Sequence, residues 1–279
     1  MSPRKLAASL GAVVLLSACG TPAPSPPASP SPPASRPFGH VHGLGTNPAD
    51  GRLYIASHNG VYVVENGAPR LVGGNRQDTM GFDVIGPDQF IASGHPADPD
   101  QPNPLGLITS GNAAQTWAGL SLVGESDLHA IDVAGDGSLV ASDVGGEQLI
   151  RSLDQGRTWD VVATLPGVID IVALPGSPFT LLVTTTDGRT TNIGADGTSA
   201  PVPAPPGLTH LDATAEGGVV GVDADGDVWR GAGDDWEKLG ALPEAASAIS
   251  TATETWHVAV GDEILSSTDE GMTWESILQ

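Results

Sequence analysis

Short apolar segments recur along this 279-residue sequence, and six of its seven histidines occupy one of two equivalent positions relative to these segments. His58 and His95 close two matching segments, YIASHNG and FIASGHP. At the other place, apolar segments that recur every 37 to 49 residues bring three histidines into register with a thioether, a carboxylate and a hydroxyl. This aligned set is His42, Met80, His129, Asp170, His210 and Ser247, and His40 lies two residues before His42.

Imidazole and thioether groups are borderline to soft metal ligands, which suit copper or zinc better than calcium or magnesium. The thioether of Met80 favours copper over zinc. The same groups could instead bind an organic or saccharide ligand, or only order water in a polar channel. The expected metal or ligand site consists of His40, His42, His58, Met80, His95 and His129, with Asp170 and His210 as second-tier channel residues.

Carboxylates are the second source of candidate chemistry. A glycoside hydrolase needs two carboxyl groups about 5 to 10 Å apart, and the catalytic candidates Glu125, Asp127 and Asp170 lie in or just before segments that carry the histidines. A lyase could use a histidine as its base, with help from a metal ion. Three functions therefore stay open: a metal- or ligand-binding protein, a glycoside hydrolase or lyase acting on surface polysaccharide, and a protein-interaction scaffold without a small ligand.

Two octapeptides indicate the elements that must position these groups. SLDQGRTW begins at Ser152 and STDEGMTW begins at Ser267. In such a turn the aspartate can accept hydrogen bonds from nearby amides, the glycine supplies a positive φ, and the tryptophan packs beneath. A degenerate copy, SGNAAQTW, begins at Ser110, and weaker partial matches lie near residues 196–198 and 234–236. These marks recur every 37 to 42 residues, which is the length of one four-stranded propeller blade.

Both octapeptides resemble the Asp-box, or BNR repeat, whose pattern is S-x-D-x-G-x-T-W. Its defining residues here are Ser152, Asp154, Gly156, Trp159, Ser267, Asp269, Gly271 and Trp274. The segments HVHGL, MGF and SGHP are similar to those of sialidase-like or glycosylhydrolase-like lipoproteins of high-GC Gram-positive bacteria. The resemblance implies an all-β fold, a six-bladed β-propeller with Asp-box turns over residues 38–279, with seven blades also open. It places functional groups on the face opposite the Asp-boxes.

Sialidase activity does not follow from this resemblance. That reaction needs three arginines that bind a carboxylate, a tyrosine nucleophile with a glutamate behind it, and an aspartate that acts as the general acid. Only Arg70 and Arg76 fall near a connection that could reach the functional face. The only tyrosines, Tyr54 and Tyr62, alternate with apolar residues and are expected in the core. The sialidase residues therefore cannot be assembled from this sequence.

The N-terminal residues predict export. Arg4 and Lys5 precede an apolar run over residues 6–16, which is too short for a permanent membrane-spanning helix. The following Leu-Ser-Ala-Cys resembles a lipobox, in which the thiol of Cys19 receives a lipid. We expect a signal peptide over residues 1–18, a proline-rich tether over residues 19–37 and one domain over residues 38–279, held at the outer face of the cytoplasmic membrane.

The charge of the chain excludes one class of partner. Removal of residues 1–18 takes away two of the 11 basic residues, so 9 basic and 33 acidic side chains remain, a formal charge of −24. Such a surface repels phosphate backbones and attracts cations. We therefore expect that the protein binds no nucleic acid. We also expect it to be a monomer.

Overall fold

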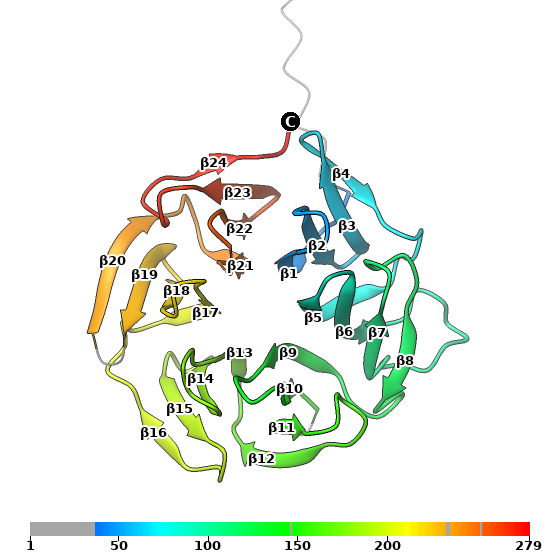
Figure 1. Cartoon of the computed structure of the whole chain (residues 1–279), viewed down its shortest axis with the longest axis horizontal. Helices are drawn as coiled ribbons and strands as arrows, with labels where there is room; N and C mark the ends of the chain where they lie inside the picture. The colour runs from blue at the N-terminus through cyan, green and yellow to red at the C-terminus, as the bar shows by residue number, and fades with distance from the viewer. Residues whose placement is uncertain (1–36, 146, 233–234, 252) are drawn as a thin grey trace, which may run out of the picture. The chain divides into compact units, whose positions relative to one another are not determined.

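The structure, a computed structural model, describes residues 37–145, 147–232, 235–251 and 253–279. They form six four-stranded antiparallel sheets that follow one another around a central axis in chain order (Figure 1). The predicted all-β fold, a six-bladed β-propeller with Asp-box turns, is confirmed. Within these ranges there is no helix, and so none long and apolar enough to cross a membrane. The predicted signal peptide, the lipidation site Cys19 and the tether up to residue 36 lie outside the described residues.

Each blade uses four consecutive strands, numbered from the axis outward. Blade 1 has β1 (Val41–Thr46), β2 (Leu53–Ser57), β3 (Gly60–Glu65) and β4 (Ala68–Leu71). Blade 2 has β5 (Asp78–Gly86), β6 (Gln89–His95), β7 (Leu107–Ser110) and β8 (Ala118–Ser121). Blade 3 has β9 (Leu128–Val133), β10 (Leu139–Asp143), β11 (Gln148–Ser152) and β12 (Asp160–Thr164). Blade 4 has β13 (Val168–Ala173), β14 (Thr180–Thr185), β15 (Thr190–Gly194) and β16 (Ser199–Pro201). Blade 5 has β17 (Leu208–Ala213), β18 (Val219–Asp223), β19 (Asp227–Ala232) and β20 (Asp235–Ala241). Blade 6 has β21 (Ala246–Ser250), β22 (Trp256–Val260), β23 (Glu263–Ser267) and β24 (Glu275–Ser276).

Strand burial follows distance from the axis. The second strands β2 and β18 are buried along their whole length, because neighbouring blades cover both of their faces. Their sequences are accordingly continuous runs of apolar and small residues rather than alternations. No residue of the outer strands β12 and β16 is fully buried. The core therefore lies between the blades rather than at the axis.

Aromatic side chains fill the space between blades 1 and 2. Phe90 packs edge-to-face against Phe82 at 5.6 Å and against Tyr54 at 4.9 Å between ring centroids. Such pairs add about 0.5–1.5 kcal/mol each to the effect of burial. The Tyr62 ring is also buried, and its hydroxyl donates to the Pro37 carbonyl at 3.1 Å. Both tyrosines are core residues, as their apolar alternation predicts.

The ring closes between blades 6 and 1 without exchange of a strand. Phe38 and Leu278 are buried in one apolar cluster that contains side chains of both blades. The Gln279 amide donates to the Gly67 carbonyl in the turn between β3 and β4 at 2.9 Å. Side-chain packing and this hydrogen bond thus join the ends of the propeller.

The Asp-box turns join the third and fourth strands. In blade 3, Ser152 Oγ accepts from the Gly156 amide at 2.7 Å, and Asp154 accepts from the amide and hydroxyl of Thr158 at 2.8 and 2.7 Å. Gly156 has a φ of +82°, and a Cβ there would lie 2.3 Å from a methyl carbon of Leu107, so the turn requires glycine. The turn of blade 6 repeats these bonds with Ser267, Asp269, Gly271 and Thr273.

The degenerate copy in blade 2 forms the same turn as the two complete Asp-boxes. Asn112 replaces the aspartate and accepts from the Thr116 amide at 3.0 Å, and the Ala114 amide donates to Ser110 Oγ at 2.9 Å. Ala114 adopts a positive φ of 62° where the other copies have glycine. The turn therefore keeps the hydrogen bonds of the motif although two of its residues differ.

Candidate functional site

One rim of the propeller collects the predicted histidines. The first strand of each blade begins and the second ends at this rim: in blade 1, Val41 at the start of β1 pairs with Ser57 at the end of β2. Asp-box turns lie at the opposite rim, because Ser152, which ends β11, pairs with Leu139, which begins β10. We call the first rim the mouth. The histidines thus lie opposite the Asp-boxes.

The blade 1–2 cluster consists of His42, His58 and Asp78. Asp78 Oδ2 lies 2.8 Å from His58 Nδ1, and Asp78 Oδ1 lies 3.4 Å from His42 Nε2. His42 Nε2 and Asp78 Oδ1 are both buried and have no hydrogen-bond partner. Each residue can offer one ligand atom such that all three atoms lie within 4.8 Å of one another. Across the described ranges, this is the one group of His, Cys, Asp or Glu side chains that meets this requirement.

The blade 2–3 cluster consists of His95, Asp127 and His129. Asp127 Oδ2 lies 2.9 Å from His129 Nε2 and 3.4 Å from His95 Nε2, and His95 Nδ1 lies 2.7 Å from Asn103 Oδ1. Burial raises the pKa of Asp127, but the hydrogen bond from His129 and the charges of His129 and His95 outweigh it, so the pKa is lowered. Asp127 Oδ1 is buried without a hydrogen-bond partner. This carboxylate orients two imidazoles.

The two clusters repeat one contact between neighbouring blades. His58 follows β2 and His95 ends β6, and each meets an aspartate at the start of the first strand of the next blade. Asp78 directly precedes the buried Thr79, as Asp127 precedes the buried Leu128. Sequence reasoning missed Asp78, although this place before a buried first-strand residue is a signal that marks it.

A β-bulge and a glycine with positive φ at the mouth orient the side chains of the two clusters. The pairing of β1 with β2 shifts between Val41 and Gly43, so His42 is an extra, bulged residue. A bulge leaves its extra residue unpaired and redirects its side chain, and His42 lines the central cavity. Gly94 has a φ of +140°, and a Cβ there would lie 2.0 Å from the Asp78 carbonyl oxygen. Glycine therefore allows β6 to approach β5 closely enough to bring His95 and Asp78 to the same rim.

A polar cavity of about 180 Å³ occupies the axis and contains most of the aligned channel residues. His42, His129, Asp170 and His210 line it together with three further aspartates, Asp83, Asp132 and Asp212. Each of these first strands has a bulge where its pairing with the second strand shifts. His42 and His129 lie in the bulge of their strands. Asp170 and His210 follow the bulge, so they lie one residue further along their strands.

Three of the channel aspartates join neighbouring blades. Asp170 accepts from its own following amide, of Ile171, at 2.9 Å and from the Leu211 amide of the next blade at 2.8 Å. Asp132 does the same with the amides of Val133 and Ala173, both at 2.6 Å, and Asp212 with those of Ala213 and Thr251. Each carboxylate thus connects two first strands, which links blades 3 to 4, 4 to 5 and 5 to 6.

Burial dominates the acid–base properties of the channel. It raises the pKa of Asp170 to about 7, of Asp212 to about 7 and of Asp132 to about 6, against the lowering effect of the backbone hydrogen bonds. It lowers the pKa of His210 to about 4, so this imidazole is neutral at pH 7. Burial also lowers the pKa of His42, against the attraction of Asp78.

The remaining candidates lie in different surroundings. His40 is exposed, but it is close enough that its charge contributes to the lowered pKa of His42. Met80 is partly buried in β5 and is not among the residues that line the central cavity. Glu125 is exposed in the turn before β9. Among the residues expected at the metal site, the structure therefore groups His42 with His58 and His95 with His129.

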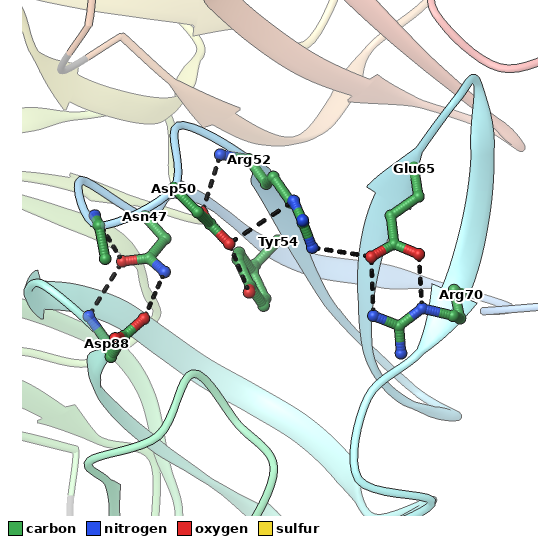
Figure 2. A network of polar contacts seen from close by, with 8 residues as sticks. Asn47, Asp50, Arg52, Tyr54, Glu65, Arg70 and Asp88 are labelled. Carbon is green, nitrogen blue, oxygen red and sulfur yellow. Dashed lines mark hydrogen bonds and ion pairs between the residues drawn. The ribbon is translucent and has the colours of Figure 1, made fainter.

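Arg70, expected near a connection that could reach the functional face, lies elsewhere. Its guanidinium donates two hydrogen bonds to Glu65 at 2.7 and 2.8 Å, and Arg52 donates to the same carboxylate at 2.8 Å (Figure 2). Glu65 ends β3, which begins at the mouth and runs away from it. Both arginines are therefore engaged at the Asp-box rim.

The fold has relatives of known structure, but the sequence matches no family model and no curated protein. A protein assigned as a gluconolactonase superimposes with a TM-score of 0.61 at 18% identity, covering 88% of this chain and 93% of that one. Virginiamycin B lyase from Staphylococcus aureus gives 0.58 at 14% identity, covering 86% and 84%.

The extracellular domain assigned to a hybrid two component system of B. thetaiotaomicron gives a TM-score of 0.58 at 12% identity and covers 87% of this chain. The present chain spans about a third of that protein, 34% of its length. At these identities the likeness concerns the fold alone, and these neighbours are β-propeller proteins.

Proposed function

We propose that this protein is an exported, lipid-anchored binding protein whose propeller holds a divalent transition metal ion through His42, His58 and Asp78. One observation carries the proposal: His42 Nε2 and Asp78 Oδ1 are buried, have no hydrogen-bond partner and lie 3.4 Å apart. Leaving two such atoms unsatisfied costs about 1–3 kcal/mol each. A cation between them satisfies both.

The donor set limits the kind of metal. Two imidazoles and a carboxylate suit Cu²⁺ or Zn²⁺ and are unlike the all-oxygen sites of Ca²⁺ and Mg²⁺. Cu²⁺ binds nitrogen and oxygen donors more tightly than Zn²⁺ does, which supports copper as the preferred ion without requiring Met80 as a ligand.

The proposed location rests on the N-terminal sequence. The lipobox-like segment that ends at Cys19 and the proline-rich stretch after it are typical of a lipoprotein with a tether, and the Asp-boxes are similar to those of sialidase-like lipoproteins. The structural neighbour from B. thetaiotaomicron is itself an extracellular domain. With a formal charge of −22, the chain attracts cations toward its surface.

The test is metal binding by the purified chain and by matched histidine variants. Equilibrium dialysis against Cu²⁺ or Zn²⁺ is expected to give one tightly bound ion, with Cu²⁺ displacing Zn²⁺. His42→Ala and Asp78→Asn should each weaken binding by more than the roughly 10- to 100-fold typical of residues that only orient a ligand. His257→Ala is the control, because His257 is the second residue of β22 and lies at the opposite rim. Equal binding by all four proteins would refute the site.

A further inference from the structure

We propose that the mouth hydrolyses neutral carboxylic esters or lactones, with His129 as the general base and Asp127 as the residue that positions it. This inference rests on the proposed metal site of the blade 1–2 cluster. It assigns to the blade 2–3 cluster a role in proton transfer, since that cluster contains two imidazoles on one carboxylate without the three-atom convergence of the first.

The hydrogen bond between these residues selects the reactive nitrogen. His129 Nε2–H donates to Asp127 Oδ2 at 2.9 Å, so the neutral imidazole carries its lone pair on Nδ1. A carboxylate in this position fixes the tautomer and stabilises the imidazolium that forms when Nδ1 takes up a proton. The same oxygen lies 3.4 Å from His95 Nε2, and His95 in turn contacts Asn103 at 2.7 Å, which holds Asp127 in place.

The two clusters share one cavity. His42 and His129 both line the cavity at the axis, so a substrate at the mouth meets groups of both clusters. A zinc-type ion held by His42, His58 and Asp78 would supply an acidified water and an electrophile for a carbonyl oxygen. The role of His129 Nδ1 would be to accept the proton of that water.

The step balances without a further reactant. The water oxygen forms a bond to the acyl carbon while the water proton passes to His129 Nδ1. The acyl carbon–oxygen single bond breaks, and the imidazolium returns this proton to the departing alkoxide. One ester and one water thus give one carboxylic acid and one alcohol, which stay joined as a hydroxy acid when the substrate is a lactone.

The lining of the cavity favours this substrate class. Its residues include four aspartates and neither arginine nor lysine, so no side chain with a permanent positive charge there attracts a phosphate or carboxylate substrate. An ester or lactone is neutral and has a carbonyl group for a metal ion to polarise, which a glycosidic bond lacks. Neutral acyl compounds therefore fit the site better than anionic ones or glycosides.

The test measures turnover and zinc content on the same samples. The full chain loaded with Zn²⁺ is expected to hydrolyse p-nitrophenyl acetate and δ-valerolactone, and a chelator should abolish this. His129→Ala should lower kcat by about 10²- to 10⁴-fold with zinc content unchanged. Asp127→Asn should lower kcat and displace the acid limb of the pH profile, and His257→Ala should change neither quantity. His129→Gln replaces the alanine variant if the latter does not fold.

The outcomes separate the two proposals. Bound zinc without zinc-dependent turnover of either probe overturns this inference and leaves the metal site standing. Turnover that survives in a folded His129 variant also overturns it. A chain that binds no zinc or copper overturns both.

Discussion

Replacement of Asp170 by asparagine should change how the stability of the propeller depends on pH. Burial raises the pKa of Asp170 to about 7 in the folded chain, well above its ordinary 3.8. The folded state therefore holds this proton more tightly than the unfolded state does. The stability that Asp170 contributes is fully present below about pH 4 and is lost as the pH rises through about 7.

The size of the effect follows from the two pKa values. Each tenfold change in acidity corresponds to about 1.4 kcal/mol, so the difference between 3.8 and about 7 amounts to about 4 kcal/mol. Asparagine has one oxygen, whereas Asp170 accepts from the amides of Ile171 and Leu211 with two, so Asp170→Asn should cost about 1–3 kcal/mol at pH 4. By pH 8 the variant should equal or exceed the unchanged protein in stability.

Urea unfolding followed by tryptophan fluorescence at pH 4, 5, 6, 7 and 8 measures this difference. Asp160→Asn, at an exposed residue of β12, controls for the loss of one carboxylate. The free energy of unfolding of the unchanged protein minus that of Asp170→Asn should fall by up to about 4 kcal/mol from pH 4 to pH 8. A difference that stays constant over this range would show that the Asp170 carboxyl is not held protonated by burial.

Three further substitutions test the backbone and the contacts between blades. Gly94→Ala should weaken metal binding by at least about 10-fold, as measured by dialysis, because a Cβ at this position collides with the backbone of Asp78; unchanged affinity would contradict the positioning role. Gly156→Ala should lower the free energy of unfolding by about 2 kcal/mol or more, since the residue has a φ of +82° and no room for a methyl group; urea unfolding checks this, and a neutral effect would count against the strain. Asn47→Ala should destabilise by about 1–3 kcal/mol with metal binding intact, because Asn47 exchanges hydrogen bonds of 2.9 and 3.0 Å with Asp88 of the next blade (Figure 2); a shift in metal affinity would mean that the two rims are coupled.

The architecture could be predicted because its signals are local and repeated. The two octapeptides at Ser152 and Ser267 each contain all the hydrogen-bonding groups of their turn, and their spacing to the weaker copies is that of a blade. The equivalence of His58 and His95 was visible for the same reason, since YIASHNG and FIASGHP occupy matching places in consecutive blades.

The arrangement of the site could be predicted only in part, because it depends on non-local geometry. The bulge that redirects His42 is a property of the pairing of β1 with β2 and leaves no mark in the apolar alternation. A separate bulge at Ile169 in β13 places Asp170 one residue further along its strand, where it accepts two backbone hydrogen bonds that a carboxylate count cannot reveal. Asp78 joins His42 and His58 only because blade 2 packs against blade 1, so its partners lie far from it in the sequence.

Anomalous diffraction at the copper or zinc absorption edge, from crystals of the metal-loaded chain, tests the central claim most directly. The account predicts one anomalous peak in the mouth, about 2.0–2.2 Å from a nitrogen of His42, a nitrogen of His58 and a carboxylate oxygen of Asp78. Crystals of the His42→Ala variant should lack this peak. A peak bound elsewhere, or none in the mouth of a chain saturated with the ion, would contradict the account.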